Sequence, residues 1–143
     1  MTAESETLHA CCVAIGGRGV LIEGNSGAGK SDLTLRLIDR GAELVSDDYT
    51  LLTRADAGLV GCAPDRIAGR IEVRGIGIVS LPFRHEVAVQ MMVRIEPNPD
   101  RLPERPEQRR IAGVDVPVVA LPALEPSAPI KVELALRMLA EAV

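Results

Sequence analysis

The sequence predicts an α/β domain built on a mixed sheet with one phosphate-binding loop. The segment 24–31, Gly-Asn-Ser-Gly-Ala-Gly-Lys-Ser, lies between an apolar run of strand length and a run with helical spacing. Several short apolar runs follow it, in place of a regular alternation of strands and helices. A chain of 143 residues fits one domain with a core of its own, so we expect residues 1–143 to form a single unit.

Strands and a helix are expected around the loop. Residues 8–15 and 20–23 are apolar, have strand length and are joined by a glycine-rich turn. The pattern after the loop is helical, because Leu33 and Leu37 repeat four residues apart on one face. Gly41 then provides a C-terminal stop.

The remainder is predicted as strands, one irregular segment and a final helix. Residues 97–110 contain four prolines and four arginines, a composition typical of a loop, lid or linker. Pro117 favours a position at the sheet edge for the late strand that contains it. Ser127 can cap a last helix in which Leu134 and Met138 share a face. The expected strands are 43–53 with an acidic interruption, 59–62, 70–73, 76–81, 87–95 and 114–121.

Composition argues against several function classes. The net charge of −4, with one Tyr, one Phe and no Trp, is unlike the basic or aromatic surface of a nucleic-acid-binding protein. The three cysteines have no zinc-type spacing and are expected to be small buried hydrophobes in a reducing compartment. The polar, acidic residues 1–8 do not resemble a signal peptide, and no apolar run has the length of a membrane span. We therefore expect a cytoplasmic protein that binds neither nucleic acid nor membrane.

The segment 24–31 satisfies the spacing G-x-x-x-x-G-K-[S/T] of a P-loop. Its glycines let backbone N–H groups converge on an anion, and the following helix adds the positive end of its dipole. The lysine can reach the β- and γ-phosphates, and the serine hydroxyl can ligate Mg²⁺. Lysine occurs only twice in this chain against 14 arginines, which supports a specific role for Lys30. We expect ATP and Mg²⁺ as ligands, with the nucleotide held by Gly24, Asn25, Ser26, Gly27, Ala28, Gly29, Lys30 and Ser31.

Acidic residues follow two of the expected strands. Asp47 and Asp48 end an apolar strand, where P-loop proteins hold Mg²⁺ through a carboxylate, although a solvated turn has the same pattern. Consecutive side chains of a strand face opposite sides, so the two carboxylates can share a site only at a bend. Glu72 and Arg74 lie two apart and can face a metal–phosphate site or form a surface salt bridge. His9 lies in the strand before the loop, and a lone histidine at such a position is more often structural than catalytic.

These motifs together resemble the HPr kinase/phosphorylase family, bacterial enzymes that phosphorylate a seryl residue of the phosphocarrier protein HPr. The P-loop matches with Asn25 where aspartate is usual, and residues 40–48 are similar to the family's Arg-Gly-His-x-Leu-Val-Ala-Asp-Asp. Residues 71–78, Ile-Glu-Val-Arg-Gly-Ile-Gly-Ile, are similar to the signature Leu-Glu-Ile-Arg-Gly-Leu-Gly-Ile. The resemblance implies a fold similar to the phosphoenolpyruvate carboxykinase nucleotide-binding fold, and a homo-oligomer, usually a hexamer.

The resemblance also implies catalytic roles for four residues. Asp48 would be the general base that takes the proton from the target serine hydroxyl. His9, at the position of the family's histidine, and Lys30 would assist at the phosphate. Arg101 lies in an Asp-Arg-Leu context similar to that of an active-site arginine of the family.

A magnesium site is implied next to these residues. Ser31 and Glu72 would ligate the metal, joined by Asp47 as the carboxylate at the end of its strand. Arg74 would belong to the segment important for both activities of the family.

Two departures from the family pattern are visible. The large N-terminal domain is missing, so the chain looks like a short form with the catalytic domain only. The family's Pro-x-Arg-Pro-Gly-Arg-Asn loop is linked to dephosphorylation, and the equivalent residues 122–129 contain no arginine here. We therefore expect a kinase with weak or no phosphorylase activity. A nucleotide-sensing P-loop binding module and a small-molecule kinase are the alternative functions.

Overall fold

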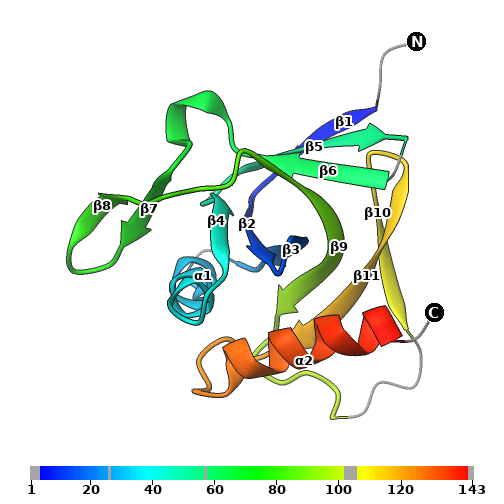
Figure 1. The fold of residues 1–143 in the computed structure, drawn as a ribbon. Helices are drawn as coiled ribbons and strands as arrows, with labels where there is room; N and C mark the ends of the chain where they lie inside the picture. The colour runs from blue at the N-terminus through cyan, green and yellow to red at the C-terminus, as the bar shows by residue number, and fades with distance from the viewer. Residues whose placement is uncertain (1–3, 26, 57, 102–105, 142–143) are drawn as a thin grey trace.

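A curled mixed sheet forms the body of the computed structural model, which describes residues 4–25, 27–56, 58–101 and 106–141 (Figure 1). The prediction of an α/β fold with a mixed sheet is confirmed. The elements in chain order are β1 (Ser5–Leu8), β2 (Ala10–Ile15), β3 (Arg18–Glu23), α1 (Lys30–Asp39), β4 (Glu43–Ser46), β5 (Thr50–Ala55), β6 (Gly58–Cys62), a 3₁₀ turn (Asp65–Ile67), β7 (Arg70–Val73), β8 (Gly77–Ser80), β9 (Glu86–Ile95), β10 (Glu107–Ile111), β11 (Val114–Leu121) and α2 (Ala128–Glu141).

The strand order explains the mixed character of the sheet. The path runs β1-β5-β6-β9-β3-β2-β4, and β11 joins β9 and is followed by β10. The pairs β3–β9 and β9–β11 are parallel, whereas the other pairs of this sheet are antiparallel. Strands β7 and β8 form a separate hairpin that projects from the body (Figure 1).

Both faces of the central strands are buried, which accounts for their continuous apolar runs. In β2, Cys11 and Val13 face a cluster that includes residues of α1 and α2, so both helices cover the same face. Ala10, Cys12 and Ala14 face a second cluster, formed where the curled sheet folds over itself. The helix after the P-loop is thus held against the sheet by Leu33 and Leu37, as their spacing predicted.

The structure corrects two of our strand predictions. Residues 107–111 form β10, although we assigned most of them to a proline- and arginine-rich loop; pairing with β11 outweighs the local composition. Pro117 does not put its strand at the sheet edge, because β11 lies between β10 and β9. The β9 ladder begins only at Val118, so Pro117 precedes the stretch that is paired on both sides.

Helix α2 begins after Ser127, but its apolar residues divide between two faces. Val132 and Leu136 are buried, whereas Leu134 and Met138, which we expected to share a face, lie on the exposed one. Neither described helix is long and apolar enough to cross a membrane.

We predict that Leu37→Ala lowers the free energy of unfolding by about 2–5 kcal/mol, because Leu37 is fully buried and truncation leaves a cavity. The matched variant Leu134→Ala, on the exposed face of α2, should change it by about 0.5 kcal/mol or less. Urea unfolding followed by far-UV circular dichroism measures both. Equal effects would mean that α1 does not pack as described.

Candidate functional site

The P-loop is shaped by close packing at its start and a left-handed residue at its end. A Cβ on Gly24 would lie 3.0 Å from the Cβ of Ile95, a tighter contact than real Cβ atoms usually make, so any other residue would have to displace Ile95 slightly. Gly29 is the N-cap of α1 and has φ of +101°, which favours glycine. The Ala28 N–H donates to the Asn25 carbonyl at 2.9 Å and tightens the curve. Ser26, which we expected to bind nucleotide, lies outside the described residues. The loop presents the N-terminus of α1 to solvent, which is the geometry of an anion site.

Lys30 folds back over the loop. Its Nζ donates to the Gly24 carbonyl at 2.8 Å and to the Asn25 carbonyl at 3.3 Å, and the residue is largely buried. The ammonium therefore lies against the first two residues of the P-loop.

Asp47 is a buried carboxylate that joins three elements. Oδ1 accepts the Ser31 hydroxyl of α1 at 2.7 Å and the Cys11 thiol of β2 at 3.2 Å. Oδ2 accepts the backbone N–H of Glu72, in β7, at 3.0 Å. Burial, reinforced by the charge of Asp47, raises the pKa of Cys11 to about 12, so the thiol stays protonated and can donate.

The part of the site around Asp47 lies in a gap between the paired strands β1–β5 and the paired strands β2–β4. The registers Leu8↔Thr50 in β1–β5 and Cys12↔Ser46 in β2–β4 belong to one antiparallel alignment. Between these registers the ladder is interrupted at residues 9–11 on one side and at residues 47–49 on the other. The alignment still sets His9 opposite Tyr49 and Cys11 opposite Asp47, so side chains of both strands meet in the gap.

Asp48 turns away from Asp47 at this bend. Its φ of +73° is left-handed, a conformation that aspartate tolerates better than most residues. Its side chain is 58% exposed, and Oδ1 lies 2.8 Å from Nε2 of His9. The two carboxylates thus lie at a bend, but one is buried in structural contacts and the other faces solvent beside a histidine.

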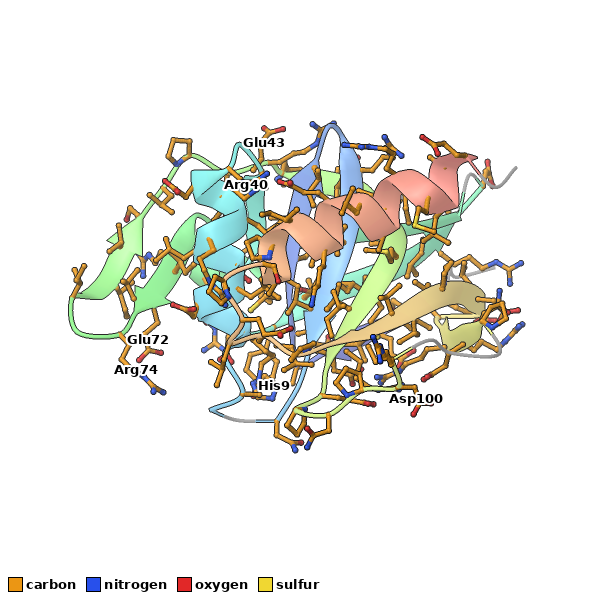
Figure 2. The ribbon with its side chains drawn as sticks, turned by 90° about the horizontal axis from the view of Figure 1, so that it is seen from below. His9, Arg40, Glu43, Glu72, Arg74 and Asp100 are labelled. Carbon is orange, nitrogen blue, oxygen red and sulfur yellow. The ribbon has the colours of Figure 1, made fainter. Side chains whose placement is uncertain are left out.

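The remaining predicted residues lie around this centre on exposed segments. Figure 2 shows Glu72 and Arg74 on the β7–β8 hairpin, His9 near the middle and Asp100 on the other side. Glu72 reaches Asp47 through its backbone, while its side chain is exposed. Arg74 and Arg101 are exposed. The described residues contain no cluster of three or more His, Cys, Asp or Glu side chains arranged for a metal. Of the expected metal ligands, Ser31 and Asp47 are therefore the pair whose side chains are in direct contact.

A cavity of about 450 Å³ opens beside the start of the P-loop, within the usual size range of ligand sites. His9, Gly24 and Asn25 are part of its wall, as are Arg109 and Glu23, which form an ion pair. This ion pair was not predicted from the sequence, because Arg109 was assigned to a loop. The contacts of Cys11 and Tyr49 were not predicted either, because only the strand register could have indicated them.

The fold and this loop define the chain as an α/β domain of the P-loop class. The family model of the HPr serine kinase C-terminal domain matches residues 1–137. HPr kinase/phosphorylase of Azoarcus sp. strain BH72 is 40% identical over 134 residues, and that of Levilactobacillus brevis is 35% identical over 133, each match covering 84% of this chain. The solved HPr(Ser) kinase/phosphatase from Coxiella burnetii superposes with a TM-score of 0.81 at 31% identity, covering 93% of this chain and 95% of that one.

The chain therefore belongs to the HPr serine kinase C-terminal domain family, as the motifs predicted. It spans 43% of the length of each of these two curated relatives, less than half.

We predict that Asp47→Asn lowers the free energy of unfolding by about 1–3 kcal/mol, because an amide nitrogen donates and so cannot accept one of the three buried hydrogen bonds. Asp48→Asn is the matched control on the exposed side and should change it by about 0.5 kcal/mol or less, since asparagine also tolerates the left-handed region. Urea titrations of both variants decide this. An unchanged free energy of unfolding in Asp47→Asn would contradict the bridging role of the carboxylate.

Proposed function

We propose that the chain is an ATP- and Mg²⁺-dependent protein serine kinase that phosphorylates a seryl residue of an HPr-type phosphocarrier protein. Residues 1–143 would be one catalytic domain. The observation that best supports this is the exposed Asp48–His9 pair, at 2.8 Å, in the gap whose other carboxylate is bonded to the P-loop serine. A protein that only senses nucleotide needs the loop, but it does not need an exposed carboxylate that could act as a base.

Asp48 is the better candidate for the general base. It is 58% exposed, so an incoming serine hydroxyl can approach its oxygens, whereas Asp47 is 6% exposed and already accepts three hydrogen bonds. Asp48 accepts the hydroxyl proton as the serine oxygen bonds to the γ-phosphorus of ATP, the bond from that phosphorus to the bridging oxygen breaks, and ADP leaves. His9, hydrogen-bonded to Asp48, orients the carboxylate, and Lys30 supplies positive charge at the transferred phosphoryl group.

Ser31 and Asp47 would hold the metal. Their oxygens are the hard ligands that Mg²⁺ prefers, and the 2.7 Å contact brings them to one point. Glu72, whose side chain is exposed, would be the third ligand. When bound, Mg²⁺ neutralises phosphate charge during transfer.

The other expectations belong to the same proposal. The segment 24–31 cradles the nucleotide phosphates, while Arg74 and Arg101 lie on exposed segments from which they can contact the acceptor or phosphate. The protein acts in the cytoplasm as a homo-oligomer, a hexamer by resemblance to its family, with no nucleic-acid or membrane partner.

We predict that Asp48→Asn keeps ATP binding but lowers phosphoryl transfer to an HPr-type protein by about 10²-fold or more, because the base is lost and the cradle is intact. Transfer is followed with labelled ATP, and binding by isothermal titration calorimetry. The control Asp115→Asn, on the exposed side of β11, should retain full transfer. Undiminished transfer by Asp48→Asn rules out its role as base.

We also predict that dephosphorylation by this chain is weak or absent, because residues 122–129 contain no arginine to bind phosphate or phosphoserine. Two basic side chains that contact this segment are already engaged: Arg36 donates to the Ala123 and Glu125 carbonyls, and Lys131 pairs with the Glu125 carboxylate. Phosphorylated HPr is incubated with the protein and inorganic phosphate, and pyrophosphate is measured. Rapid release of pyrophosphate would contradict this prediction but would not affect the kinase proposal.

A further inference from the structure

The single tyrosine of the chain packs on the histidine that contacts the proposed base. The rings of Tyr49 and His9 are stacked, with centroids 4.9 Å apart and planes inclined by 25°. Tyr49 directly follows Asp48 in sequence, so one side of the imidazole meets the tyrosine while its edge meets the carboxylate. None of the roles derived above uses this ring.

Both backbone polar groups of Tyr49, its N–H and its carbonyl, form hydrogen bonds within the turn. The Tyr49 N–H donates to the Asp47 carbonyl at 2.9 Å, and the Ser46 hydroxyl donates to the Tyr49 carbonyl. In the next residue, the buried Thr50 hydroxyl donates to the Ala10 carbonyl at 2.8 Å, which ties the start of β5 to the start of β2. The ring therefore extends from a turn held by hydrogen bonds. The strand alignment sets this turn opposite His9.

Burial does not account for this aromatic residue. Tyr49 is 45% exposed, and the His9 side chain is 46% exposed, so neither fills the core. A hydrogen bond from Nε2 fixes one direction of an imidazole but leaves the ring free to rotate about that direction. An aromatic face against the ring fixes its plane, because stacked contact is lost on rotation.

We infer that Tyr49 is a positioning residue for phosphoryl transfer: its ring holds the His9 imidazole in the plane that keeps Nε2 on Asp48. This inference rests on the proposed role of Asp48 as the base. It assigns a function to the residue after the acidic pair, and it requires an aromatic ring there but no hydroxyl.

Kinetics of two Tyr49 variants test the inference. Tyr49→Phe keeps the ring and should leave kcat within about twofold of wild type, whereas Tyr49→Leu should lower kcat about tenfold. The KM for ATP should stay within about twofold in both, because neither variant touches the P-loop. Equal kcat values for Tyr49→Leu and wild type would overturn the inference while leaving the kinase proposal intact. So would an equal loss in both variants, since that would mean that the hydroxyl is needed.

The imidazole itself provides a readout independent of activity. The chain has two histidines, so His85→Gln leaves His9 as the only imidazole in a ¹⁵N NMR spectrum. With this background we expect one tautomer, with the proton on Nε2, in the protein with Tyr49 and in Tyr49→Phe. Tyr49→Leu should give averaged nitrogen shifts, as expected for an imidazole that exchanges between tautomers. Identical nitrogen shifts for all three would overturn the inference. If the wild-type protein transfers no phosphate at all, the kinase proposal fails, and the spectra still decide whether Tyr49 holds His9.

Discussion

The buried carboxylate of Asp47 is the interaction on which the rest of the site depends. It accepts hydrogen bonds from β2, from the first turn of α1 and from the backbone of β7, three elements far apart in sequence. A buried charge is tolerated only when such partners satisfy it. The three hydrogen bonds of Asp47 hold the first turn of α1 against the sheet. The next residue, Asp48, has a left-handed backbone conformation and an exposed side chain.

Much of the fold could be predicted because local patterns and tertiary packing agree. The helix after the P-loop formed as its spacing indicated, and most strands lie where apolar runs of strand length occur. The segment 107–111 is different. Most of it belongs to the proline- and arginine-rich residues 97–110, whose composition predicts a loop, and it forms a strand because it pairs with β11. Leu134 and Met138 show the same limit, since helical spacing gives a shared face but not which face the sheet covers.

The candidate site also has a part that the sequence predicts and a part that it does not. Residue types and order identified the loop, the acidic pair and the family, because each depends on contiguous sequence. The division of labour between Asp47 and Asp48 could not be predicted, because it depends on a bend whose two strands belong to different parts of the sheet. The contacts of Cys11 with Asp47 and of His9 with Tyr49 follow from that register, which a single sequence does not reveal.

Phosphoryl transfer itself tests the central claim most directly. The protein is incubated with labelled ATP, Mg²⁺ and a purified HPr-type phosphocarrier protein, and the labelled residue is mapped by mass spectrometry. We predict that the label appears on one serine of the phosphocarrier and requires Mg²⁺. Failure to label the phosphocarrier, under conditions where the protein demonstrably binds ATP, would contradict the account.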